Sequence, residues 1–205
     1  MRGPVEKKER SLGERLHLKG HRCDTPKCAA VRKPYRPGVH GPHGRRKALS
    51  DFGRQLFEKQ KFKVVYGLDE RALRRLFGIA EKSTRGTAMK LLELLERRLD
   101  NVIFRLGLGS SRSEARQLIV QGHIVVNGRR TRSPGYLVAK DDVVGIRSES
   151  KKLVRFQELP KAIQDYKSPL WLSLNKDTFE GKVVELPQNE APPFEINLLV
   201  ESFSK

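Results

Sequence analysis

Hydrophobic residues recur every three or four positions through the middle of the chain, which is the period of an amphipathic α-helix. Two such stretches, residues 51–66 and 69–81, predict two short helices. A third and stronger pattern begins at about Thr87 and continues to Leu106, where a Gly-Leu-Gly segment ends it. These three helices are expected to form a compact helical unit.

A fourth helix is predicted over residues 111–122, because both of its ends carry recognised signals. Ser111 can cap the first turn, and Glu114, three residues on, can accept a hydrogen bond from the backbone amide of Ser111. Gly122 then ends the helix.

The β-branched run that follows predicts a strand. Residues 123–126 read His-Ile-Val-Val and lead directly into Asn127-Gly128, a strong short-range signal for a β-hairpin turn. Residues 143–146 and 182–186 are expected to form further strands. The predicted fold class is therefore α+β, in which a run of helices precedes a small antiparallel sheet.

The chain is strongly basic. It has 42 lysine and arginine residues against 24 aspartate and glutamate residues, a net charge of +18. Such a charge favours a polyanionic partner, and nucleic acid is the most direct candidate. A membrane surface would also attract the charge, but the sequence shows neither a contiguous apolar anchor nor a strongly amphipathic basic helix.

The charge is graded along the chain. Counted as lysine and arginine minus aspartate and glutamate, it is +10 in residues 1–50 and zero in residues 151–205. The first segment also holds six glycines and five prolines with few large apolar side chains, so it cannot offset the entropy of ordering by burying a core. We therefore predict that residues 1–49 form an extended basic arm that RNA organises.

Arginines accompany the capped helix and the hairpin turn. Arg112 and Arg116 are four residues apart and therefore share one face of the predicted helix. Arg129, Arg130 and Arg132 follow the Asn-Gly turn. Because a planar guanidinium group suits bidentate contact with phosphate oxygens, helix and hairpin are expected to present one continuous basic edge to nucleic acid.

The stretch from Arg97 to Ile146 resembles the RNA-binding module named after the fourth protein of the bacterial small ribosomal subunit. Three segments carry this resemblance: RLDNV at 98–102, SRSEARQL at 111–118 and GHIVVNG at 122–128. The resemblance extends to nearly the whole chain through six further segments: RPGVHG at 36–41, LSDFG at 49–53, LFEKQK at 56–61, YG at 66–67, PLWL at 169–172 and FSK at 203–205.

This family resemblance implies a helical domain interrupted by an inserted module, in which a small antiparallel sheet packs on helices. The chain is then expected to divide into four segments. These are the arm at 1–49, a helical domain at 50–95, the RNA-binding module at 96–160, and a C-terminal segment at 161–205 that completes the sheet and packs back on the helical domain.

The resemblance also implies a function. Family members are structural, non-enzymatic constituents of the small ribosomal subunit in the cytoplasm, and they bind the 5′ domain of small-subunit rRNA directly and early in assembly. No cofactor is expected. The residues expected to bind RNA are Arg112, Arg116, Arg129 and Arg130 in the module, and Arg54, Lys59, Lys61 and Lys63 on the first predicted helix.

Family members further line the path by which mRNA enters the subunit, beside the third and fifth small-subunit proteins. Arg45, Arg46 and Lys47 match the basic loop of the family at that path. They are expected to contact messenger phosphates.

Cys23 and Cys28 raise the question of a zinc site. Three histidines lie nearby in the sequence: His21, His40 and His43. In relatives that bind zinc, four cysteines supply the ligands, and here Glu6 and Glu9 stand approximately where the first pair would be. The favoured interpretation is two reduced cysteines and no bound metal, with mixed ligation by cysteines and histidines as the alternative.

Two other classes of function stay open. Arg98-Leu99-Asp100 resembles the motif of pseudouridine synthases in which the aspartate is catalytic, and an RNA-modifying or ribosome-rescue factor can carry the same module. The triplet is expected inside the third helix, and the chain has no room for a separate catalytic domain, which favours a structural or salt-bridging Asp100. A zinc-finger DNA regulator would need a complete ligand set and a recognition helix, and neither is visible.

Overall fold

The computed structural model describes residues 4–44, 48–188 and 194–203. The chain forms two compact units, one made of Met1–Leu92 with Glu190–Lys205 and the other of Glu93–Asn189. The second unit is thus inserted into the sequence of the first. The four segments expected from the sequence stay a prediction about domain organisation, whereas the structure groups the chain into these two units.

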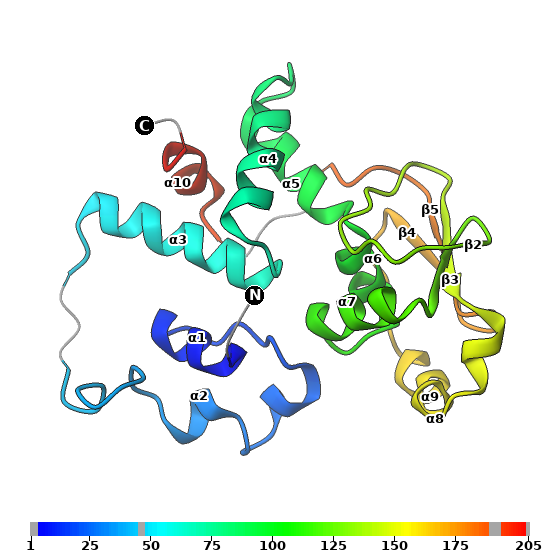
Figure 1. The fold of residues 1–205 in the computed structure, drawn as a ribbon, viewed down its shortest axis with the longest axis horizontal. Helices are drawn as coiled ribbons and strands as arrows, with labels where there is room; N and C mark the ends of the chain where they lie inside the picture. The colour runs from blue at the N-terminus through cyan, green and yellow to red at the C-terminus, as the bar shows by residue number, and fades with distance from the viewer. Residues whose placement is uncertain (1–3, 45–47, 189–193, 204–205) are drawn as a thin grey trace. The chain divides into compact units, whose positions relative to one another are not determined.

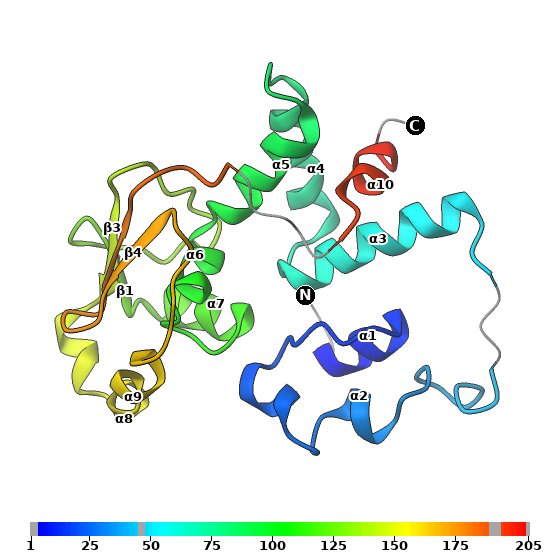
Figure 2. The ribbon, with the colours of Figure 1, turned by 180° about the vertical axis from the view of Figure 1, so that it is seen from behind.

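The first unit is helical. Its elements are α1 (Val5–Leu12), the 3₁₀ turn η1 (Gly20–Asp24), α2 (Ala29–Arg32), α3 (Asp51–Val65), α4 (Glu70–Glu81), the first part of α5 (Thr87–Glu96) and α10 (Ile196–Glu201). Helices α3 and α4 begin where side chains cap them: the Ser50 hydroxyl accepts from the Gly53 amide at 3.2 Å, and the Asp69 carboxylate accepts from the Ala72 amide at 2.7 Å. The C-terminal helix α10 lies beside α3 (Figure 1, Figure 2).

The N-terminal segment is more ordered than its composition predicted. Between Val5 and Arg32 it contains α1, η1 and α2, and it buries a small set of side chains: Glu9, Leu12, Leu18, Cys23 and Cys28. The Arg10 guanidinium donates to the carbonyls of Lys33 at 2.8 Å and Tyr35 at 2.9 Å. These hydrogen bonds hold the segment together where apolar side chains are few. After Arg32, residues 33–44 form bends and turns without helix or strand, so this part of the predicted arm is irregular.

The second unit packs helices on a five-stranded sheet. Its helices are α6 (Leu99–Arg105), α7 (Arg112–Gln121), α8 (Val154–Gln157) and α9 (Leu159–Ile163), with the 3₁₀ turn η2 (Ser148–Lys152). Its strands are β1 (Ile124–Val126), β2 (Arg129–Arg130), β3 (Val143–Ile146), β4 (Leu172–Asn175) and β5 (Glu180–Val183). The strand order is β2-β1-β3-β5-β4, and every neighbouring pair is antiparallel. The α+β fold class is confirmed.

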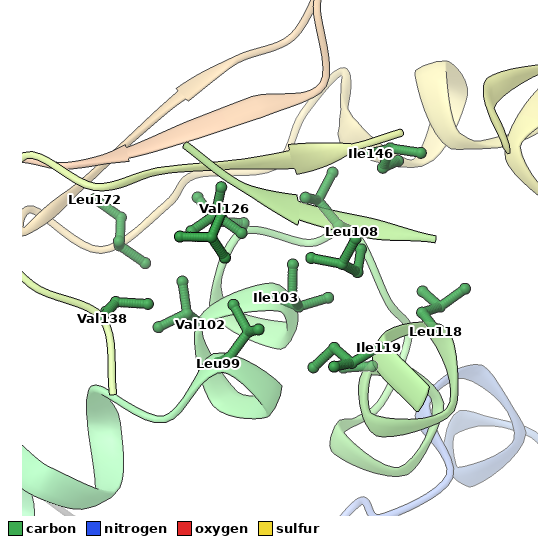
Figure 3. Packing of buried hydrophobic residues seen from close by; sticks show 14 of the residues in the cluster. Leu99, Val102, Ile103, Leu108, Leu118, Ile119, Val126, Val138, Ile146 and Leu172 are labelled. Atoms are coloured by element: carbon green, nitrogen blue, oxygen red, sulfur yellow. The ribbon is translucent and has the colours of Figure 1, made fainter. Parts of the chain in front are cut away.

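One apolar core joins α6 and α7 to the sheet. Figure 3 shows Val102 and Ile103 of α6 and Ile119 of α7 facing Val126 of the sheet, and all four residues are buried. At Gly181 of β5, an added Cβ atom would lie 2.4 Å from a methyl carbon of Leu106. The strand therefore needs glycine there, because only a residue without a side chain lets α6 approach the sheet so closely.

The helix predicted from Thr87 to Leu106 is two helices, and this prediction was wrong in one respect. Between α5 and α6, Arg98 is extended, with φ −63° and ψ 136°. The Leu99 amide donates to the carbonyl of Tyr136 at 2.8 Å, and the Val138 amide donates to the carbonyl of Arg97 at 3.0 Å. The backbone pairs with a distant loop at this point, so it cannot continue its helical hydrogen bonds.

Two smaller expectations also need correction. The strand expected at 182–186 is β5, which begins at Glu180 and ends at Val183, and its partner β4 had not been predicted. At the start of α7, the Glu114 carboxylate accepts from the Ser110 amide at 2.8 Å, one residue earlier than the capping-box pattern placed it. None of the helices in the described ranges is long and apolar enough to cross a membrane.

Candidate nucleic-acid interface

Helix α7 holds the two arginines predicted for RNA binding. The Ser111 hydroxyl caps the helix by accepting from the Glu114 amide at 3.2 Å, and Gly122 ends it in the left-handed region at φ 79°. Arg112 is half-buried: its Nε donates to Asn101 Oδ1 at 2.8 Å, and its guanidinium carbon lies 4.5 Å from the centre of the Phe104 ring. These two contacts fix the direction of the guanidinium group on the surface of the unit.

Arg116 lies one turn further along α7, on the same face. Its side chain is 48% exposed, and its Nη1 lies 3.7 Å from Asp100 Oδ2. Asp100 is buried and is held by two hydrogen bonds from Arg98, at 3.1 and 2.7 Å. A buried carboxylate with a buried arginine partner thus orients the exposed arginine and leaves its outer donors for a partner molecule.

A second buried acid supports Arg112 through an amide. The Asn101 side-chain amide donates to Glu96 Oε2 at 2.8 Å, and Arg105 donates to the two carboxylate oxygens of Glu96 at 3.0 and 3.2 Å. Sequence reasoning had not identified Glu96, Asn101 or Arg105 as part of the site. Their spacing along the sequence does not predict that they are in contact, because the bend at Arg98 between α5 and α6 brings the three side chains together.

The hairpin carries the other two arginines predicted for the module. Asn127 and Gly128 both have positive φ, 50° and 76°, as a tight hairpin turn of this kind requires. Arg129 is exposed, whereas Arg130 turns back and donates to the backbone carbonyls of Gly122 at 3.1 Å and Gln121 at 3.2 Å. Arg130 therefore caps the C-terminal end of α7, where a positive charge is favourable.

The predicted continuous basic edge is divided between the two ends of α7. Arg112 is the first residue of this helix and Arg130 binds the carbonyls at its end, and the nine steps of about 1.5 Å between Arg112 and Gln121 place the two positions roughly 14 Å apart. Each end has its own set of arginines, so a nucleic acid would have to span the length of the helix to contact both.

Two further arginines, Arg147 and Arg155, lie near α7, and Arg155 reaches its first turn at Glu114. Burial, followed by the nearby charges of Arg155, Arg130 and Arg147, lowers the pKa of His123 below its ordinary value of 6.5. Arg155 also donates to Glu114 Oε1 at 2.8 Å. Burial by itself would raise the pKa of the Glu114 carboxyl, but the hydrogen bonds from Ser110 and Arg155 outweigh it and lower that pKa. Sequence reasoning missed Arg147 and Arg155, which lie outside the segment from 112 to 132.

The four residues predicted on α3 differ in their surroundings. Arg54 is exposed and has no ion pair or side-chain hydrogen bond within the described residues. Lys61 is only 9% exposed and lies 2.6 Å from both Glu58 and Glu14. Burial would lower the pKa of Lys61, but these two carboxylates outweigh it and raise that pKa.

Lys59 and Lys63 share one carboxylate. Both lie against Glu70 of α4, at 2.6 and 2.9 Å, and the Lys59 ammonium also lies 3.9 Å from the centre of the Phe203 ring. The structure therefore brings three of the four α3 residues to acids of the same unit, whereas Arg54 forms no ion pair among the described residues. The three residues expected at the mRNA path, Arg45, Arg46 and Lys47, lie outside the described residues.

The cysteine region holds buried thiols without a set of metal ligands in the described part of the chain. Cys23 and Cys28 are both buried, and burial raises the pKa of the Cys23 thiol. Within residues 4–44, 48–188 and 194–203, no three His, Cys, Asp or Glu residues lie together as metal ligands would. Glu9 instead accepts from the backbone amides of Leu16 and His17.

Comparisons with known proteins agree with this arrangement. The family model described as "Ribosomal protein S4/S9 N-terminal domain" matches residues 1–96, and the model described as "S4 domain" matches residues 97–144. The chain is 47% identical over 206 residues to small ribosomal subunit protein uS4 of Halothermothrix orenii, covering 100% of this chain and 98% of that protein.

Two further relatives carry the same name. The chain is 48% identical over 198 residues to the protein of Pelotomaculum thermopropionicum, covering 96% of this chain and 94% of that protein. It is 44% identical over 205 residues to the protein of Natranaerobius thermophilus, covering 99% of this chain and 98% of that protein. With the helix-and-hairpin geometry described above, these full-length similarities show that the chain belongs to the family of small ribosomal subunit protein uS4.

Proposed function

We propose that the chain is a non-enzymatic constituent of the small ribosomal subunit that binds small-subunit rRNA directly and nucleates assembly of its 5′ domain. The observation that carries this proposal is the pair Arg112 and Arg116 on α7, which Asn101 and the buried Asp100 hold in place. Arginines positioned in this way can bind phosphates without first losing side-chain freedom, which increases affinity.

Recognition would depend on RNA shape more than on base sequence. Folded RNA presents phosphates and 2′-hydroxyl groups, and its deep, narrow major groove excludes side chains. The arginines at the two ends of α7 would contact phosphates that lie a helix length apart. A junction of RNA helices provides such a spacing, and the resemblance of the sequence to the ribosomal family supports the 5′ domain as the RNA that contains it.

We further propose that Arg45, Arg46 and Lys47 contact mRNA at the entry path, beside the third and fifth small-subunit proteins. This part of the proposal rests on the sequence resemblance alone. Phosphate contacts by a basic loop would hold a messenger of any sequence, because phosphates carry no direct sequence information.

The surroundings of Asp100 argue against catalysis on RNA. A catalytic aspartate must reach the substrate, but the Asp100 side chain is 5% exposed and both of its oxygens accept hydrogen bonds from Arg98. The Arg-Leu-Asp triplet begins α6 and does not lie inside a long helix, yet its aspartate has the salt-bridging role expected from the sequence.

The test is binding of purified protein to an RNA fragment comprising the 5′ domain of small-subunit rRNA, over a range of salt concentrations. Changing Arg112 and Arg116 together to Ala should lower the affinity and reduce the slope of log K against log salt by about 1.5, which is two phosphate contacts. The control changes Lys161 and Lys167, two exposed lysines of the same unit, to Ala. An unchanged slope in the arginine variant would remove α7 from the interface.

A hydroxyl-radical footprint on the same RNA tests the partner itself. Protection confined to a junction of several RNA helices is the expected result. Failure of the wild-type protein to bind this RNA at low salt would overturn the proposed function. The thermal unfolding of each variant should be measured alongside, because Arg112 also bonds to Asn101.

A further inference from the structure

Helix α4 has one apolar face and one basic face. At about 100° per residue, the buried side chains of Leu73, Leu76, Phe77 and Ala80 form one side of the helix. Phe77 stacks on Phe203, with ring centres 4.8 Å apart, so this side is anchored within the first unit. The opposite side is formed by five positions: Arg71, Arg74, Arg75, Gly78 and Lys82.

The four cations of this face have no acidic partner among the described residues. All four side chains are exposed, and within the described residues none of them takes part in an ion pair or a side-chain hydrogen bond. The nearest acids by sequence do not offset them: Glu70 is bound to Lys59 and Lys63, and Glu81 lies about 80° away from the middle of the face. The face therefore carries a concentrated positive charge.

Gly78 lies at the centre of this basic face. Glycine inside a helix costs stability relative to alanine, because the unfolded chain loses more conformational freedom when it folds. Here neither backbone nor packing requires it: Gly78 has no positive φ, and an added Cβ atom would meet no heavy atom within 4 Å. The absence of a side chain at Gly78 leaves the helix backbone open to close approach by a partner.

We propose that the outer face of α4 is a second RNA-binding surface, on which a ribose–phosphate backbone lies across Gly78 while Arg71, Arg74, Arg75 and Lys82 contact phosphates on both sides. The inference rests on the proposed function, since it gives the same RNA a second contact. From Arg71 to Lys82 the face extends over eleven residues, about 16 Å.

The chemistry of the face selects RNA over other partners. Guanidinium groups bind phosphate oxygens bidentately, and the wide, shallow minor groove of an RNA helix admits a protein surface that has no bulky side chain at its centre. A protein interface or a membrane surface would need large apolar anchors. The face has none, and the exposed Ile79 lies to its side.

The test compares the same new side chain at two neighbouring positions, Gly78→Gln and Ile79→Gln. Both variants introduce glutamine on the exposed surface of α4 and leave every charge in place. Binding to the RNA fragment of the 5′ domain should weaken about tenfold for Gly78→Gln, the loss of one or two charge-assisted contacts. It should change less than about twofold for Ile79→Gln, as for an ordinary surface substitution.

A smaller side chain at the same position separates an effect on RNA binding from an effect on protein stability. Gly78→Ala should raise the melting temperature of the free protein, because alanine is the better helix former, and should still weaken RNA binding. A destabilised fold could not produce that combination of results.

Two outcomes would overturn the inference while leaving the proposed function intact. In the first, the wild-type protein binds the RNA and Gly78→Gln binds it equally well. In the second, Gly78→Gln binds naked RNA normally but is lost from assembled small subunits, which would assign the face to a protein partner. Absence of wild-type binding would instead be a failure of the proposed function.

Discussion

Helices α3 and α4 lie in the same unit and carry similar numbers of basic residues, yet they differ in how those residues are used. On α3, Lys59, Lys61 and Lys63 are bound to carboxylates of the same unit. On α4, the cations of the outer face have no such partners among the described residues. The difference teaches that the number of lysines and arginines on a helix does not measure the charge that it offers to RNA.

The largest expected effect comes from removing the lysine that is buried most deeply on α3. Lys61→Ala leaves Glu58 without a compensating charge, and loss of one partner of a buried pair is strongly destabilising. Because Glu14 is 46% exposed, we expect a decrease in the free energy of unfolding on the order of 2 kcal/mol, below the value for a fully buried pair. Denaturant unfolding of the two proteins measures this decrease in the free energy of unfolding.

The matched control on the same helix is Arg54→Ala. Arg54 is exposed, so the free energy of unfolding should change by less than about 0.5 kcal/mol, while RNA affinity should fall if Arg54 contacts RNA as predicted. A Lys61→Ala protein that unfolds like the wild type but binds RNA weakly would show that the comparison of α3 with α4 is wrong.

A smaller effect is expected when charge is removed from each helix in turn. Changing Arg71 and Arg75 together to Gln should reduce the slope of log K against log salt by about 1.5, because two phosphate contacts are lost. Changing Lys59 and Lys63 together to Gln removes the same charge, yet it should reduce the slope less, because the Glu70 carboxylate that both lysines contact already offsets one of the two charges. Equal slopes for the two variants would remove the distinction between the helices.

The smallest expected effect is a change in the stability of the protein at acidic pH. Burial would raise the pKa of Glu70, but the hydrogen bonds and charges of Lys59 and Lys63 outweigh it and lower that pKa below the ordinary value of 4.5. A carboxyl whose pKa is lower in the folded state stabilises the protein above its unfolded-state pKa, and this contribution is lost as the pH falls through the folded value.

The wild-type protein should therefore be more stable than Glu70→Gln near neutral pH, by less than about 1 kcal/mol since the side chain is partly exposed. The difference should shrink as the pH falls below 4.5. Urea titrations of the two proteins at several pH values measure it. A difference that grows towards acid would reverse the assigned sign of the pKa shift.

Local signals predicted much of the inserted unit. Ser111 and Gly122 bound α7, and Asn127-Gly128 forms the expected turn, because caps and tight turns depend on a few consecutive residues. The bend at Arg98 could not be predicted, because loop residues about forty positions away cause it. Arg112 and Arg116 were identified as candidates, but the buried acids that orient them were not.

The sequence by itself determined the sign and concentration of the charge, the boundaries of the capped helices, and the family to which the chain is similar. Tertiary structure alone decided which cations are available. Lys63 and Arg71 are both basic residues on amphipathic helices, but chain folding brings Glu70 to Lys63 and no acid to Arg71 among the described residues. Coulomb interactions act across space, so the pairing of a charge depends on neighbours that the order of residues along the chain does not specify.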